Sequence, residues 1–169
     1  LNGTGVPELG DILLLPFSEE IKLGLYRGKM DKTTEKASPG YYAVNLPDLG
    51  VCVEITATER VAYHKYTFKK GAARLLVDLQ NGLVHSPEAL GRHVLFSEIQ
   101  MPDQQTITGF NEVSEWVRRK FFFVISFDRP YAIEKVLNAQ SGEKGKKMVL
   151  KFEGVKPGDV VQVKVAVST

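Results

Sequence analysis

The sequence contains very little cysteine and almost no excess of charge of either sign. Its 169 residues include a single cysteine, Cys52, so an intrachain disulfide is excluded and the fold must depend on an apolar core. Basic residues number 22 and acidic residues 20, and the basic ones are scattered, which does not suggest nucleic-acid binding. No stretch approaches the ~18 consecutive apolar residues of a membrane span. We therefore expect neither a nucleic-acid partner nor a membrane-spanning segment.

The residue patterns of common catalytic sites are also missing. The three histidines, His64, His85 and His93, lack the spacing of a metal site, and no second cysteine accompanies them. No serine lies in a Gly-x-Ser-x-Gly elbow, and no spacing assigns two carboxylates as an acid and base pair. We expect no catalytic residue, metal ligand or cofactor in this chain. His64, in a strand with Tyr63 and Tyr66, is interpreted as a hydrogen-bonded structural residue.

What the sequence has in abundance is the alternation of apolar and polar residues that is typical of half-buried strands. Residues 51–57 and 161–167 show this alternation most clearly. Helical periodicity is limited to one amphipathic turn formed by Val113, Trp116 and Val117. These patterns predict an all-β fold with little helix.

The expected strands follow one another at intervals of about 10–15 residues, which suits a sandwich. They comprise residues 11–15, 41–46, 51–58, 60–68, 72–79, 93–99, 106–110, 121–125, 131–137, 148–152 and 161–167. At roughly 150 residues per domain, the length corresponds to one domain. We predict a supersandwich-like antiparallel β-sandwich that forms a single domain over residues 1–169.

Finer expectations follow from the same patterns. Residues in the strongest strand patterns should contribute to the core, namely Ile55, Leu75, Val77, Phe122, Val124 and Val163. The polar stretches 31–39 and 138–146 should be surface loops. Pro157 and Gly158 stand at the two central positions of a type II turn, so we expect the strands on either side of this turn to be neighbours.

The first residues of the chain form a glycine-rich segment, Asn2-Gly3-Thr4-Gly5. The Gly-Lys-Ser/Thr sequence and the helix of a phosphate-binding loop do not follow it. Its two glycines lack a Cβ and therefore allow the backbone to approach a ligand closely. From these residues alone, an ordinary turn remains the other interpretation.

Several short sequence motifs occur in a fixed order along the chain. They are Leu1-Asn2-Gly3-Thr4-Gly5 with Glu8-Leu9-Gly10-Asp11, Pro39-Gly40-Tyr41-Tyr42, Glu54 to Arg60 with His64, Tyr66 and Phe68, Ile107-Thr108-Gly109, Trp116, and Phe122-Phe123-Val124 with Ser126 and Pro130. In identity and order these strings resemble the N-terminal β-sandwich domain of the α-mannosidases of glycoside hydrolase family 92. The resemblance covers most of the chain.

The resemblance implies that the chain is most of the N-terminal domain of a larger glycosidase (EC 3.2.1.-), truncated at both ends. The parent protein would hydrolyse terminal α-mannosides, as an α-1,2-mannosidase-like enzyme with inversion, and would process mannose-containing glycans such as N-glycans. Its catalytic residues and calcium would belong to a helical (α/α)6 domain that is absent here, so the fragment alone should be inactive. By the same resemblance the parent is a periplasmic or secreted bacterial protein.

The family's active site lies between the two domains, and the resemblance implies that the sandwich contributes loops to it. Gly3, Thr4, Gly5 and Glu8 are the expected substrate-binding residues of this chain. Trp116 and the pair Glu59 and Arg60 are interpreted as structural and are not included in the expected site.

Two other functions fit a β-sandwich. One is a stand-alone carbohydrate-binding module, and the other is a purely structural or adhesion domain. A binding module would display two or three coplanar aromatic rings on one exposed face. Most phenylalanines and tyrosines of this sequence stand at strand-interior positions, which weighs against a module.

Overall fold

The computed structural model describes residues 10–19, 21, 28–81, 93–114, 117–137 and 144–169. In these residues it contains strands and no helix, and hence no helix that could span a membrane. The strands are β1 (Leu13–Phe17), β2 (Asp31–Ser38), β3 (Tyr41–Leu46), β4 (Val51–Ala57), β5 (Val61–Phe68), β6 (Ala73–Asp78), β7 (His93–Asp103), β8 (Thr106–Ser114), β9 (Arg118–Phe127), β10 (Ala132–Leu137), β11 (Lys147–Phe152) and β12 (Val160–Ser168). The predicted all-β class is confirmed.

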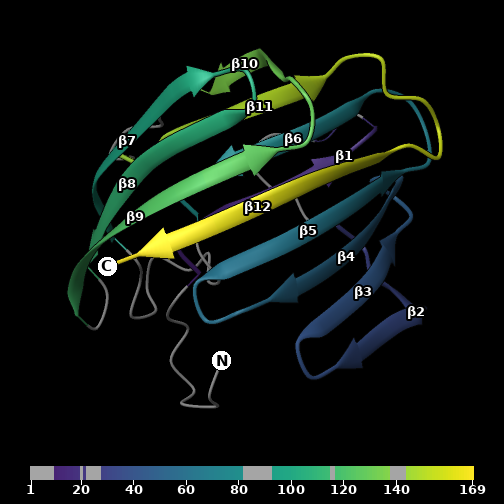
Figure 1. Ribbon diagram of the computed structural model, residues 1–169, viewed down its shortest axis with the longest axis horizontal. Helices are drawn as coiled ribbons and strands as arrows, with labels where there is room; N and C mark the ends of the chain where they lie inside the picture. Colours follow the sequence, from purple (N-terminus) through teal and green to yellow (C-terminus); the bar gives the residue numbers. More distant parts are fainter. Residues whose placement is uncertain (1–9, 20, 22–27, 82–92, 115–116, 138–143) are drawn as a thin grey trace.

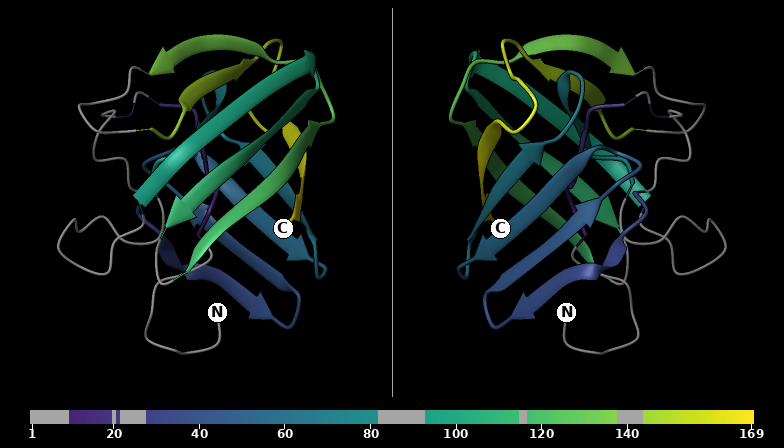
Figure 2. Two further views of the ribbon diagram at one scale, coloured as in Figure 1. Left: turned by 90° about the vertical axis from the view of Figure 1, so that its left-hand side faces the viewer. Right: turned by 90° about the vertical axis from the view of Figure 1, so that its right-hand side faces the viewer.

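The strands form two antiparallel sheets that pack face to face (Figures 1 and 2). The small sheet has four strands in the order β1-β6-β11-β10, and the large sheet has eight in the order β2-β3-β4-β5-β12-β9-β8-β7. Leu75, Val77 and Val163 are fully buried, as predicted, and Ile55 is partly buried against the core. The antiparallel β-sandwich is therefore confirmed, with its core between two sheets of unequal size.

The prediction that Phe122 and Val124 contribute to the core is wrong. Their side chains are 49% and 44% exposed on the outer face of β9. The alternate residues of this strand, Phe121, Phe123 and Ile125, are the buried ones. Residues 121–125 are apolar on both faces of β9. The sequence of this strand therefore does not show which face the small sheet covers.

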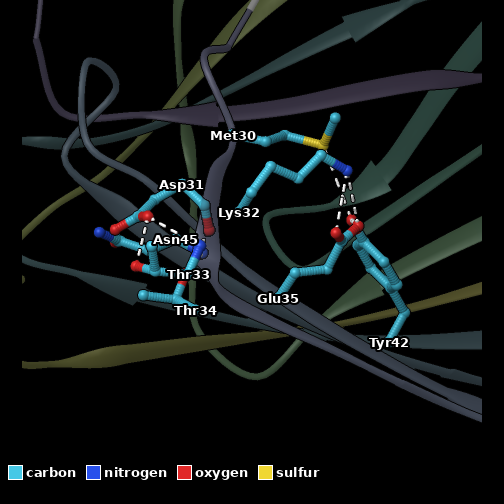
Figure 3. Close-up of polar contacts among 8 residues, drawn as sticks. All are labelled: Met30, Asp31, Lys32, Thr33, Thr34, Glu35, Tyr42 and Asn45. Carbon is cyan, nitrogen blue, oxygen red and sulfur yellow. Dashed lines mark hydrogen bonds and ion pairs between the residues drawn. The ribbon is translucent and has the colours of Figure 1, made fainter.

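The polar stretch 31–39 was expected to be a loop, but most of it is the edge strand β2. Its side chains bond mainly to one another and to β3 (Figure 3). The Thr33 hydroxyl donates to Asp31 Oδ1 over 2.7 Å, and Glu35 accepts from the Tyr42 hydroxyl over 2.7 Å. An edge strand with an exposed face needs no apolar residues, and charged residues on it oppose edge-to-edge aggregation.

The Pro157-Gly158 turn is present, but it does not join neighbouring strands. Gly158 has a φ of +94°, and the Asp159 amide donates to the Lys156 carbonyl over 3.0 Å, which fits a type II turn. The expectation of adjacent strands is wrong because β11 belongs to the small sheet and β12 to the large one. The turn instead bonds to the end of β5, where the Gly158 amide donates to the Phe68 carbonyl over 2.7 Å. Residues 153–159 cross the space of about 10 Å that separates packed sheets.

The expected helical turn at Val113 is also wrong. Val113 is fully buried in β8, where it pairs with Arg119 of β9, while Val117 is 63% exposed. The segment around Val113 forms β8, which pairs with β7 on one side and with β9 on the other. A single isolated helical turn is not stable by itself, so the strand is favoured. Trp116 and most of the predicted loop 138–146 lie outside the described residues.

Candidate functional site

A hollow of about 720 Å³ opens at one end of the sandwich. It lies where β5 and β9 begin and β12 ends, at the end of the molecule marked by the C-terminus in Figure 1. The lining residues are Gly10, Asp11, Ile12, Leu13, Leu14, Glu59, Arg60, Ala62, His64, Phe121, Val165, Val167, Ser168 and Thr169. Its size is that of pockets that hold small ligands.

The walls of the hollow are mostly apolar. Strand alternation turns Ala62, Phe121 and Val165 away from the outer face of the large sheet, and Val165 pairs with Ala62 across β12 and β5. Ile12 and Leu14, at the start of the small sheet, line the hollow as well. An apolar surface of this kind can pack against the C–H groups of a sugar ring, while a few polar groups fix its orientation.

His64 is a polar group of this wall. Its Nδ1 lies 2.7 Å from the hydroxyl of Tyr66, and the two rings meet edge to face with centroids 5.7 Å apart. The expected hydrogen bond of His64 is therefore confirmed. Burial lowers the pKa of His64 to about 4, so its imidazole is neutral near pH 7.

An ion pair holds the segment before β1 against the wall of the hollow. Arg119 Nη2 lies 2.7 Å from Asp11 Oδ1, and both side chains are largely buried. The bond joins the segment before β1 to the start of β9, across the gap between the two sheets. Asp11 is thereby held on the wall of the hollow beside Gly10.

The hairpin between β4 and β5 forms the rim and presents Glu59 and Arg60. The Thr58 amide donates to the Val61 carbonyl over 2.8 Å, which closes the hairpin. The Val167 amide donates to the Arg60 carbonyl over 3.0 Å, which ties the hairpin to the end of β12. Glu59 and Arg60, interpreted from the sequence as structural, both line the hollow.

The expected substrate-binding residues Gly3, Thr4, Gly5 and Glu8 lie outside the described residues. Their assignment stays a prediction. The described chain begins at Gly10, which lines the hollow.

Sequence reasoning missed His64 as a pocket residue, although a signal was present. His64 stands in phase with Ala62, Tyr66 and Phe68, so it is a polar residue on the apolar face of its strand. Asp11, Glu59 and Arg60 belong to the motif strings quoted above, but only the fold brings the segment before β1 and the β4–β5 hairpin to the same end of the sandwich.

The described residues contain no group of three or more histidine, cysteine or acidic side chains that could hold a metal ion. The described polar groups that line the hollow can offer hydrogen bonds and charge to a ligand.

The family model described as the glycosyl hydrolase family 92 N-terminal domain matches residues 1–168. A solved family GH92 α-mannosidase from Bacteroides thetaiotaomicron, in complex with mannoimidazole, superposes with a TM-score of 0.80 at 30% identity over 99% of this chain and 24% of its own. A family GH92 inverting mannosidase from the same organism gives a TM-score of 0.70 at 19% identity over 93% of this chain and 21% of its own, a likeness of fold. The chain thus spans about a quarter of these structures. The comparison with curated proteins finds no match.

Proposed function

The chain belongs to the N-terminal domain family of glycosyl hydrolase family 92, and on that premise we propose that it shapes the substrate pocket of a larger glycosidase. The parent protein hydrolyses terminal α-mannosides, of the α-1,2 type, with inversion of configuration. The observation that carries this proposal is the hollow at the end of the sandwich, where a mostly apolar wall presents His64, Glu59 and Arg60.

The proposed role of the wall is to position sugar hydroxyls. An inverting glycosidase needs an acid and a base about 6.5–9.5 Å apart, with a water between them. A neighbouring domain can hold the sugar in the reactive orientation without supplying either carboxylate, and such orientation contributes strongly to the rate. We assign Gly3, Thr4, Gly5 and Glu8 to the same wall, because Gly10 and Asp11, which follow them closely in the chain, line the hollow.

The remaining machinery is proposed to belong to a further domain, the helical (α/α)6 domain, which holds the catalytic carboxylates and calcium. The described residues of this chain gather no set of ligands for such an ion. The parent protein acts on mannose-containing glycans, N-glycans among them, in the periplasm or outside a bacterial cell.

One observation favours the alternative of a carbohydrate-binding module. Three phenylalanines, Phe96, Phe110 and Phe122, lie close together on the outer face of the large sheet, where Phe96 is 52% exposed. Aromatic residues are thus present on an exposed face, although the sequence pattern predicts most of them at strand-interior positions. However, Phe96 and Phe110 stack at 5.6 Å, and Lys120 Nζ lies 3.8 Å from the centroid of Phe110, so these rings cover one another. That arrangement leaves less ring surface for a sugar than a flat platform would.

The test compares the whole parent protein with the 169-residue chain. The parent, supplied with calcium, is expected to release mannose from terminal α-mannosides as the β-anomer, which proton NMR detects before mutarotation. The chain alone is expected to release none. Hydrolysis by the chain alone, or a parent protein that binds mannosides without cleaving them, contradicts the proposal, and the second result supports the binding module.

A further inference from the structure

His64 lies at the boundary between the buried core and the hollow. On the inward face of β5 it is followed by Tyr66 and Phe68, which are 1% and 0% exposed. His64 itself lines the hollow. The Nδ1 edge of the His64 ring therefore faces the buried Tyr66 hydroxyl, and the His64 side chain also forms part of the wall of the hollow.

The bond to Tyr66 determines which ring nitrogen carries the hydrogen. The Tyr66 hydroxyl has one hydrogen, and His64 Nδ1, at 2.7 Å, is its partner among the described residues. If Nδ1 carried the hydrogen, the phenol hydrogen would be buried without an acceptor, which is unfavourable. Tyr66 therefore donates to Nδ1, and in the neutral imidazole the hydrogen is on Nε2.

Nε2 is available to a ligand. No described residue bonds to it, and His64 lines the hollow, so a ligand in the hollow can reach this side of the ring. The charged groups that line the hollow are Asp11, Glu59 and Arg60, of which Asp11 pairs with Arg119. Burial alone lowers the pKa of His64 to about 4. Near pH 7 the wall thus offers an uncharged N–H donor.

We propose that His64 is a substrate-positioning residue, whose Nε2–H donates a hydrogen bond to a hydroxyl oxygen of the mannoside in the hollow. Tyr66 selects the tautomer that makes this donation possible. The inference rests on the proposed function, because it takes the hollow as a wall of the mannoside pocket. The chemistry it requires of the ligand is a neutral oxygen acceptor next to an apolar ring face.

The kinetic test uses the whole parent protein with an aryl α-mannoside as substrate. His64→Leu removes the donor, and we expect KM to rise about tenfold with little change in kcat, since a hydrogen bond made equally in the ground and transition states is lost. His64→Gln places an amide N–H at a similar reach and should recover most of the affinity. A KM in the Leu variant equal to that of the wild type, or a Gln variant as impaired as the Leu variant, overturns the inference.

A spectroscopic test can be made on the wild-type protein, so its outcome does not depend on whether a variant folds. In the parent protein labelled with ¹⁵N-histidine, the His64 resonances should report a hydrogen on Nε2 at pH 7, and methyl α-mannoside should shift the Nε2 signal. Tyr66→Phe removes the donor to Nδ1 and should mix the two tautomers. A wild-type signal with the hydrogen on Nδ1, or an Nε2 signal that the mannoside leaves unchanged, overturns the inference.

The two proposals fail in different ways. A wild-type parent protein that cleaves no α-mannoside overturns the proposed function and this inference together. A wild-type parent protein that cleaves α-mannosides, while His64→Leu keeps the wild-type KM, overturns only the role of His64.

Discussion

Asp11 and Arg119 are 108 residues apart in the sequence, yet Asp11 Oδ1 and Arg119 Nη2 lie 2.7 Å apart in the fold. This pair joins the segment before β1 to the start of β9, beside the hollow. Their side chains are 17% and 19% exposed, so the bond is protected from water much better than a surface ion pair. The ion pair therefore holds the segment before β1 in place on the wall of the proposed pocket.

Loss of this ion pair should destabilise the fold and disturb the pocket. For Arg119→Met we expect the free energy of unfolding to fall by about 1–3 kcal/mol, because a largely buried carboxylate loses this charged partner. Arg118→Met is the matched control, since Arg118 is 70% exposed and pairs with Glu112 on the outer face; its cost should be below about 1 kcal/mol. Urea unfolding of both variants measures the difference. Equal costs would show that the Asp11 pair has no special role.

Gly109 should be intolerant of any side chain for a packing reason. A Cβ at this position would lie 2.1 Å from the Glu98 carbonyl oxygen and 2.7 Å from Phe123 Cζ. Gly109→Ala should therefore cost about 2–4 kcal/mol of unfolding free energy, since strand β7 must move. Gly154→Ala is the control, because a Cβ there meets nothing within 4 Å and only its φ of +72° is unfavourable; about 1 kcal/mol is expected. A Gly109 variant as stable as the control contradicts the close packing of β7 against β8.

Adjacent phenylalanines of β9 should contribute unequally to stability, because successive side chains of a strand point to opposite faces of the sheet. Phe123 is 2% exposed and Phe122 is 49% exposed. Phe123→Ala should lower the free energy of unfolding by about 3–5 kcal/mol, whereas Phe122→Ala should cost about 1 kcal/mol, mainly through its contact with Phe110. Denaturant midpoints of the two variants decide the matter. The reverse order would restore the interpretation of Phe122 as a core residue.

The neutral state of His64 predicts a pH dependence of stability. Its pKa is about 4 in the folded chain and near 6.5 when unfolded. As the pH falls from 6.5 to 4, the unfolded state binds the proton first, so this contribution to stability is present above pH 6.5 and lost on acidification. Between pH 7 and pH 4.5 the loss should be about 2–3 kcal/mol. His64→Gln lacks this loss, so the change in unfolding free energy between the two pH values should be smaller in the variant. Identical changes in both proteins contradict the buried neutral imidazole.

Much of the fold could be predicted because strand alternation is a local property. The expected strand at 41–46 coincides with β3, and the buried strand at 72–79 contains β6. Sheet membership is not local: the Pro157-Gly158 turn has the same geometry whether the chain stays in one sheet or crosses to the other. Likewise β2 is a strand through its pairing with β3 and carries no apolar pattern that could reveal it.

The candidate site was harder to predict because it is assembled from distant segments. The Asp11 and Arg119 pair depends on the packing of one sheet on the other. His64 was recognisable as a polar residue on an apolar strand face, but its place in the hollow depends on the distant segments of β1, β9 and β12 that line the hollow with it. Motif resemblance identified the loop with Gly3 and Gly5, whose role stays a prediction.

Gly3→Val in the whole parent protein tests whether this chain forms part of the mannoside pocket. Valine adds a Cβ and two methyl groups where close backbone approach to the sugar is expected. The measurement is kcat/KM for an aryl α-mannoside together with the thermal midpoint, with Gly154→Val as a control for lost stability at an exposed turn. We predict that Gly3→Val lowers kcat/KM at least about tenfold while its thermal midpoint stays close to that of the wild type. Unchanged kcat/KM, or activity lost only in proportion to unfolding as in the control, would contradict it.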